Sequence, residues 1–128
     1  MKVVLDTHAF LWWITDDDRL SPDARSIIAN RENELFLSAA TGWEIAIKAK
    51  LGRIHVPGKV DSFIAKQLEL NDIYSLPIHM SHALNIYNLP DYHRDPFDRL
   101  IISQAQLEKM SILTSDPQIA RYGVKVVW

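Results

Sequence analysis

The chain contains no cysteine among its 128 residues. Disulfide bonds and thiolate zinc sites are therefore excluded, and nothing in the composition favours secretion. Long apolar runs are missing too, since no stretch approaches the ~20 residues of a membrane-spanning helix. The first apolar run, Val3-Val4-Leu5, is cut short by Asp6 and differs from a signal peptide, which has a basic start and a longer apolar stretch. We expect a cytoplasmic protein.

An excess of positive charge is also missing. The formal net charge is -2 and the isoelectric point is about 6.2, which excludes a broadly basic nucleic-acid binder. If the protein acts on a nucleic acid, the contact must be local, or a bound cation must reverse the sign of the site. The chain has neither a Gly-x-Gly-x-x-Gly segment nor a Walker loop, which argues against a nucleotide cofactor.

Short apolar segments alternate with longer, partly polar segments along the whole chain. Apolar residues make up 48% of it, enough for a buried core in a single domain spanning residues 1–128. The pattern predicts strands over residues 2–5, 34–37, 73–76, 111–114 and 124–127. It predicts helices over residues 7–14, 23–30, 41–51, 60–70, 81–87 and 97–109, and a last short helix opened by Asp116-Pro117. Apolar strands separated by helices are typical of a three-layer α/β/α domain with a mostly parallel five-stranded sheet.

Four acidic residues occupy similar positions relative to these elements. Asp6 follows the first strand and Asp116 follows the fourth, whereas Glu44 and Asp98 lie in the first turns of two helices. In a parallel sheet, the carboxyl ends of strands and the amino ends of the following helices share one edge, where ligand sites form. We therefore expect these four side chains to converge. Asp95, three residues before Asp98, is a fifth candidate.

Each acid except Asp6 also has a clear structural interpretation. Asp95-Pro96 and Asp116-Pro117 have the sequence of a helix cap followed by proline, and Glu44 has capping-box spacing with Thr41. Acids in a first helical turn also interact favourably with the helix dipole. Asp6 has less structural need, because it ends an apolar strand. Capping and a role in a site are compatible for Asp95 and Asp116.

Convergence of these acids would require a cation. Two carboxylates ~4 Å apart repel each other by about 4 kcal/mol at an effective dielectric constant of 20. Several of them on one edge would raise each other's pKa or weaken the fold. Mg²⁺ and Mn²⁺ prefer carboxylate and water oxygens as ligands, so converging acids predict a site for one of these ions.

The segments around these acids resemble the successive motifs of PIN-domain nucleases, and of VapC-type toxins of bacterial toxin–antitoxin pairs in particular. The resemblance covers essentially the whole chain and rests on Asp6-Thr7-His8, Trp43-Glu44-Ile45, Arg94-Asp95-Pro96-Phe97-Asp98-Arg99 and Thr114-Ser115-Asp116. It implies a PIN-like fold and a ribonuclease that uses Mg²⁺ or Mn²⁺, is often dimeric and is silenced by an antitoxin. It also implies metal-binding or catalytic roles for Asp6, Glu44, Asp98 and Asp116, with Asp95 supporting a ligand or capping its helix.

The chemistry expected of such a site is metal-assisted hydrolysis of an RNA phosphodiester bond. One or two cations would bind a non-bridging phosphate oxygen and lower the pKa of a water molecule oriented for attack. Glu44 is a candidate for taking the proton of that water, although the sequence does not assign this role. Thr7 and Ser115 adjoin acids and are supporting candidates, with turn capping as the alternative for both.

Basic, aromatic and histidine residues provide further candidates with ordinary alternatives. Lys48, Lys50 and Arg53 belong to the densest basic run, which either grips an RNA backbone or forms a solvated face. Arg99 is expected to pair with a neighbouring acid or a phosphate. His93 is by default an exposed loop histidine, with contact to a phosphate as the alternative, and His79 and His82 are expected to form a structural or solvated pair. Two arrangements are open for Trp12 and Trp13: one ring in the core and one at a dimer or antitoxin surface, or both rings in the core.

Other functions fit the sequence less well. A haloacid-dehalogenase-like phosphatase would need a second acid where His8 stands, and a receiver-like domain would need a phosphoacceptor after the third strand, which ends at Pro77. Two alternatives stay open: a stand-alone PIN-like nuclease without an antitoxin, and a non-catalytic α/β binding module whose acids only cap helices. The sequence does not identify the RNA target.

Overall fold

Strands and helices alternate along the chain in the computed structural model, which describes residues 1–128. The strands are β1 (Lys2–Leu5), β2 (Glu34–Ser38), β3 (Ile73–Leu76), β4 (Ser111–Leu113) and β5 (Val126–Val127). The helices are α1 (Thr7–Ile14), α2 (Pro22–Ala29), α3 (Ala39–Lys50), α4 (Val60–Leu70), α5 (Met80–Asn85), the 3₁₀ turn η1 (Ile86–Asn88), α6 (Pro96–Glu108) and α7 (Pro117–Ala120). No helix combines the length and the apolar character needed to cross a membrane.

All five strands belong to one sheet in the order β3-β2-β1-β4-β5. Every neighbouring pair is parallel, which confirms the predicted parallel architecture. In the central strand, Val3 pairs with Leu35 of β2 on one side and with Ser111 of β4 on the other. The chain therefore builds outward from β1 to β3, crosses back, and continues with β4 on the opposite side of β1. The strand order reverses between β1 and β4, the position where ligands bind in open α/β sheets.

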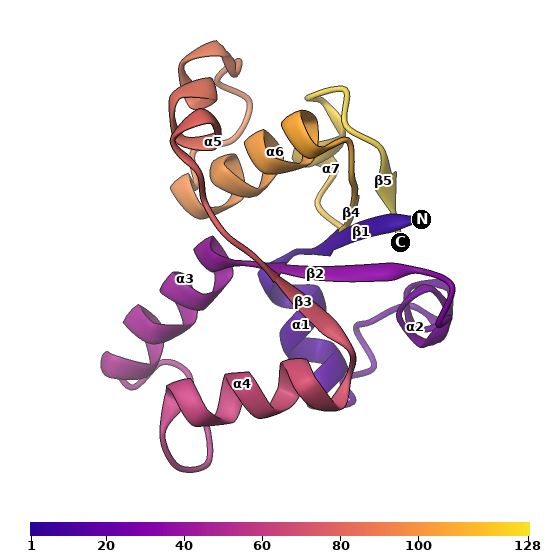
Figure 1. The fold of residues 1–128 in the computed structure, drawn as a ribbon, viewed down its shortest axis with the longest axis vertical. Helices are drawn as coiled ribbons and strands as arrows, with labels where there is room; N and C mark the ends of the chain where they lie inside the picture. The colour runs from indigo at the N-terminus through magenta and orange to yellow at the C-terminus, as the bar shows by residue number, and fades with distance from the viewer.

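Helices cover both faces of this sheet, as Figure 1 shows, with α1, α2 and α4 on one side and α6 and α7 on the other. Alternation along β1 explains the two layers, because successive side chains of a strand point to opposite faces. Val3 and Leu5 belong to the core cluster under α1 and α2, whereas Val4 belongs to the cluster under α6 and α7. The expected three-layer α/β/α arrangement is confirmed.

Several element boundaries differ from those predicted. Helix α3 begins at Ala39 rather than at Thr41, because Ser38 caps it by accepting a hydrogen bond from the Ala40 N–H at 2.9 Å. Strand β2 therefore runs directly into α3 without a loop. The last strand is shorter than the predicted 124–127, and α5 ends at Asn85 before a 3₁₀ turn.

Candidate active site

Asp6 and Asp116 lie on the two sides of the strand-order reversal. Asp6 directly follows β1 and caps α1, where its Oδ1 accepts a hydrogen bond from the Ala9 N–H at 2.7 Å. Asp116 follows β4 and caps α7, where its Oδ1 accepts from the Gln118 N–H at 2.9 Å. In both residues this cap engages only Oδ1.

Burial gives Asp6 unusual protonation behaviour. Loss of solvent raises the pKa of the Asp6 carboxyl above its ordinary value, and hydrogen bonds from Thr114 and Ala9 counteract the rise. A buried carboxylate favours protonation unless a positive charge accompanies it, so this residue is suited to facing a cation.

Asp95 and Asp98 open α6 in different ways. Asp95 is the cap, with Oδ1 accepting from the N–H groups of Phe97 (2.8 Å) and Asp98 (3.1 Å). Asp98 lies in the first turn and caps nothing. Burial and, after it, the negative charges of Asp95, Asp6 and Glu44 raise the pKa of its carboxyl to about 7, although His93 opposes the rise. Burial, together with the neighbouring acids, thus holds Asp98 close to half-protonated at neutral pH.

Glu44 reaches the same region from α3, where it is buried. Its Oε1 accepts from the Thr7 hydroxyl at 2.7 Å, and its Oε2 contacts the Lys48 Nζ at 2.6 Å. The predicted capping box with Thr41 is therefore wrong, since Ser38 is the cap and both Glu44 oxygens are engaged elsewhere. The Thr41 hydroxyl instead lies 3.0 Å from the Thr7 hydroxyl. Thr7 therefore contacts one of the predicted ligand residues, as expected of a supporting residue, and the alternative of turn capping is not observed.

These side chains line one polar cavity of about 260 Å³, which we name the carboxylate cavity. All four acids predicted to converge are among its lining residues, together with Asp95, Thr7, Ser115 and Lys48. The full lining consists of Asp6, Thr7, His8, Trp12, Glu44, Lys48, Asp95, Asp98, Ser115 and Asp116. Three other predicted site residues do not line the cavity: Lys50, Arg53 and Arg99.

His93 contacts two of the cavity acids, a role that the sequence interpretation missed. It is not an exposed loop histidine, because only 15% of its side chain is exposed. Its Nε2 lies 2.9 Å from Asp116 Oδ2 and 3.1 Å from Asp98 Oδ2, so the ring bridges two of the acids. Its Nδ1 accepts a hydrogen bond from the Asp95 N–H at 3.1 Å. Because Nδ1 is an acceptor, the proton of the neutral ring is on Nε2, which donates toward the carboxylates.

The loop that carries His93 is held by Tyr122 and Arg99. The His93 N–H donates to the Tyr122 hydroxyl at 2.7 Å, and Arg99 Nη1 donates to the His93 carbonyl at 3.2 Å. Arg99 Nη1 also donates to the Pro90 carbonyl at 3.0 Å, while its nearest acid, the fully exposed Asp91, is 3.8 Å away. Arg99 thus supports the site through the loop backbone rather than by contacting one of the cavity acids or facing the cavity.

The geometry of this cluster is compatible with a metal ion. The ligand atoms of His93, Asp98 and Asp116 all lie within 4.8 Å of one another. Two oxygen ligands of Mg²⁺, each about 2.1 Å from the ion, are separated by at most about 4.2 Å, so small side-chain movements suffice. Carboxylates are the ligands such an ion prefers, and their mutual repulsion favours its binding.

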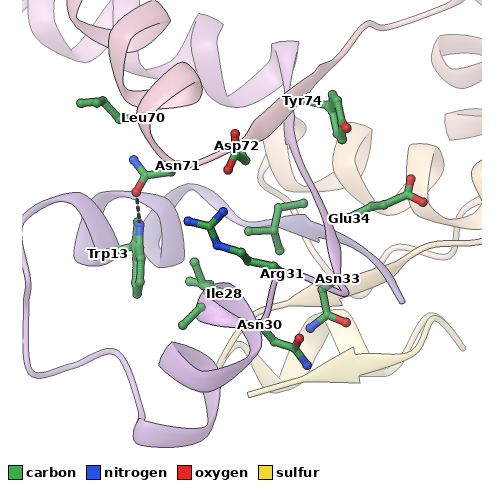
Figure 2. Close-up of a pocket in the computed structure, with 12 residues that line it drawn as sticks. Trp13, Ile28, Asn30, Arg31, Asn33, Glu34, Leu70, Asn71, Asp72 and Tyr74 are labelled. Atoms are coloured by element: carbon green, nitrogen blue, oxygen red, sulfur yellow. Dashed lines mark hydrogen bonds between the residues drawn. The ribbon is translucent and has the colours of Figure 1, made fainter.

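A larger hollow of about 430 Å³ lies at the opposite edge of the sheet (Figure 2). It is formed near the start of β2 and β3, with Trp13, Arg31 and Asn71 among its lining residues. The Trp13 Nε1 donates to Asn71 Oδ1 at 2.9 Å across it. None of the predicted site residues lies there, so chemistry rather than size places the candidate active site in the smaller cavity.

Comparison with known proteins identifies the family of the chain. Residues 3–125 match the PIN domain family. This chain belongs to the PIN domain family. It is 30% identical over 118 residues to Ribonuclease VapC22 of Mycobacterium tuberculosis, covering 91% of this chain and 88% of that protein.

Solved structures share the fold of this PIN domain. VapBC2 from Rickettsia felis, bound to a DNA fragment from its promoter, has a chain that matches with a TM-score of 0.69 and 14% identity, covering 99% of this chain and 98% of that one. FitAcB from Neisseria gonorrhoeae matches with a TM-score of 0.64 and 20% identity, covering 98% and 96%. At these identities the similarity establishes the fold alone.

The remaining histidine and tryptophan candidates of the PIN domain are structural. His82 is fully buried, accepts the His79 N–H at Nδ1 and contacts Glu108 through Nε2 at 2.8 Å, which confirms the structural interpretation of that histidine. Trp12 and Trp13 are both half-buried and pack against the core cluster on the α1 side of the sheet. Of the two alternatives for this pair, packing of both rings against the core is therefore the one observed.

Proposed function

We propose that this PIN domain is a metal-dependent endoribonuclease that hydrolyses RNA phosphodiester bonds. One observation carries the proposal: four acids from separate segments converge in a cavity at the reversal of strand order, and one has its pKa raised to about 7. Perturbed carboxyls in a cleft are typical of functional sites. The relative named as a ribonuclease supports the choice of RNA as substrate.

We assign the metal-holding role to the carboxylates of Asp6, Asp98 and Asp116, with Glu44 as the fourth acid. A bound Mg²⁺ or Mn²⁺ would polarise a phosphate oxygen and lower the pKa of a water molecule. His93 holds Asp98 and Asp116 by directing its Nε2–H toward both. Glu44 is a poor candidate for the general base, because Thr7 and Lys48 already occupy its oxygens.

The alternative in which these acids only cap helices accounts for part of the site. Asp6, Asp95 and Asp116 do cap helices, but each does so through Oδ1. Asp98 and Glu44 cap nothing, and both are placed where neighbouring acids repel them. A purely structural arrangement gives no reason for acids that cap no helix to gather at this edge of the sheet. The enzyme is therefore the better interpretation.

Removal of divalent cations is expected to abolish RNA cleavage by this protein. Without a cation the four acids repel one another. No metal ion is then present to polarise the substrate phosphate or to lower the pKa of a water molecule, so the reaction stops. Purified protein is incubated with total RNA in Mn²⁺, Mg²⁺ or EDTA, and the cleaved ends are mapped. Cleavage restored by adding Mn²⁺ after EDTA is the expected result, whereas undiminished cleavage in EDTA would contradict the metal role.

We further propose that the protein is the toxin of a toxin–antitoxin pair, acts in the cytoplasm and forms a homodimer. The structural similarity to chains from VapBC complexes supports an antitoxin partner. Co-expression with the product of the neighbouring reading frame is expected to yield a stable complex that does not cleave RNA. Light scattering of the free protein measures its oligomeric state. A neighbouring product that neither binds nor inhibits would favour a stand-alone nuclease.

A further inference from the structure

Lys48 is the only lysine or arginine that lines the carboxylate cavity, whose other lining residues include all five acids discussed above. Its Nζ lies 2.6 Å from Oε2 of Glu44, whose side chain is only 7% exposed. The two residues are four positions apart in α3, a spacing that places both side chains on one face of the helix. The cavity therefore contains a positive charge of its own before any metal ion binds.

A chain of buried hydroxyl groups holds Glu44 on its other side. The Thr7 hydroxyl donates to Glu44 Oε1 at 2.7 Å, and the Thr41 hydroxyl lies 3.0 Å from that of Thr7. Because Thr7 donates its proton to Glu44, Thr41 is the donor in the contact between the two hydroxyls. All three side chains are buried. Both oxygens of Glu44 thus have partners within the protein, and its carboxylate is fixed in an orientation that faces Lys48.

The ligand atoms that can share one cation lie in another part of the cavity. The group whose ligand atoms all lie within 4.8 Å of one another consists of His93, Asp98 and Asp116, and Glu44 does not belong to it. Asp6 also lies outside this group, but its carboxylate makes no ion pair with a lysine or arginine. Glu44 is therefore the one acid among the four that already has a cation.

We propose that the Lys48 ammonium group takes the place of a second metal ion, so that the carboxylate cavity binds a single divalent cation. In this arrangement Glu44 holds Lys48 rather than a metal. The inference rests on the proposed metal-dependent function, and it adds the number of cations and a role for Lys48.

The position of the ammonium group gives the physical reason. A Mg²⁺ ion bound by Glu44 would lie about 2.1 Å from one of its oxygens, close to the place that Lys48 Nζ occupies at 2.6 Å. Two cations so close together repel each other, and α3 keeps the lysine beside the cavity. In two-metal sites the ions lie about 3.5–4 Å apart and stabilise both the attacking and the leaving oxygen. The Lys48 side chain is 36% exposed, so its charge has access to a phosphate group and can supply part of that stabilisation.

The test counts the Mn²⁺ ions bound per chain in the absence of RNA, by calorimetric titration and by electron paramagnetic resonance. Wild type is expected to bind one Mn²⁺ and to give the spectrum of an isolated ion. Lys48→Met keeps the length of the side chain but removes the charge that neutralises the buried Glu44 carboxylate. This variant is expected to bind a second Mn²⁺, and the two neighbouring ions should give an exchange-coupled spectrum.

A double variant, Glu44→Gln with Lys48→Met, separates the two roles open to Glu44. It replaces an ion pair by two neutral side chains of similar size, so the total charge of the cavity stays the same. We expect it to bind one Mn²⁺ with an affinity within a few-fold of wild type, because no metal ligand has been removed. Asp116→Asn removes an oxygen of the metal cluster and should weaken Mn²⁺ binding far more.

Lys50→Met is the matched control. Lys50 lies two residues further along α3, is exposed and does not line the carboxylate cavity, so this variant should still bind one Mn²⁺. Two Mn²⁺ ions bound by wild type, or one bound by Lys48→Met, would overturn the proposal. A loss of affinity in the double variant as large as that of Asp116→Asn would also overturn it, since Glu44 would then be a ligand.

RNA cleavage by the wild-type protein is measured separately. Cleavage by a wild type that binds two Mn²⁺ ions means that the inference about Lys48 fails alone. One bound Mn²⁺ that becomes two in Lys48→Met, without any RNA cleavage by the wild type, means that the nuclease proposal fails and the role of Lys48 in the metal site stands.

Discussion

Asp98→Asn is expected to abolish RNA cleavage and to raise the melting temperature of the metal-free protein at about pH 8. Both effects have the same origin. The Asp98 carboxylate would bind the cation, and in the absence of the cation its negative charge destabilises the folded protein. Asp98 is only 21% exposed, and burial with its acidic neighbours raises its pKa to about 7. Asparagine keeps the shape and removes the charge, so it relieves the repulsion while removing a metal ligand.

The direction of the pH dependence follows from this raised pKa. The folded protein holds the Asp98 proton more tightly than the unfolded chain, whose carboxyl has the ordinary value of 3.8. The free energy of unfolding is therefore least affected below that value and falls as the pH rises toward 7. The full penalty is present above pH 7 and is at most about 4 kcal/mol. The Asn variant lacks this penalty.

Thermal unfolding in EDTA of wild type and Asp98→Asn, at about pH 4 and about pH 8, tests the expectation. The variant should melt several degrees higher at the alkaline pH and close to wild type at the acidic pH. Asp91→Asn is the matched control, since Asp91 is fully exposed and should change neither stability nor cleavage. Equal melting temperatures at both pH values, together with retained cleavage, would leave Asp98 without either role.

Parallel topology explains why the acids could be predicted from the sequence. Asp6 and Asp116 follow apolar strands, and Asp98 lies in the first turn of α6, so any parallel sheet brings them toward one edge. The prediction that Glu44 lies in the first turn of its helix is wrong, because α3 begins at Ala39 and Glu44 stands in its second turn. The strand order was not predictable in the same way, because it depends on which strands pair. That order places Asp6 and Asp116 on adjacent strands, β1 and β4, and so decides where the site lies.

Contacts between distant segments explain what the sequence did not reveal. Two residues with capping side chains stand near the start of α3, and Ser38 is the cap rather than Thr41 because β2 continues directly into the helix. His93 lies in a loop whose pattern is that of any polar turn. Its position depends on the Tyr122 hydroxyl, which comes from 29 residues further along the chain. Such contacts follow no regular spacing along the chain, so no sequence pattern predicts them.

His93 is the residue whose replacement is expected to have the second largest effect. The Asp95 N–H fixes the proton on Nε2, and Tyr122 and Arg99 fix the backbone, so the ring acts as a rigid donor to Asp98 and Asp116. Groups that orient metal-ligating side chains typically contribute about 10- to 100-fold to metal affinity. His93→Ala should weaken Mn²⁺ binding, and with it cleavage, by a factor in that range.

His93→Gln separates a positioning role from direct ligation of the metal. The amide N–H of glutamine can replace the Nε2–H donor, so this variant is expected to bind Mn²⁺ within a few-fold of wild type. Calorimetric titration with Mn²⁺ in the absence of RNA gives the affinities without relying on activity. Nitrogen-15 spectra of the wild-type ring in Mg²⁺ should keep the Nε2–H signature. Loss of the Nε2 proton on addition of Mg²⁺ would indicate that His93 is a ligand instead. An equal loss of Mn²⁺ affinity in the Ala and Gln variants would indicate the same. A nitrogen ligand would also shift the metal preference of the site from Mg²⁺ toward the later transition metals. Imidazole binds those ions well, whereas Mg²⁺ prefers carboxylate oxygens.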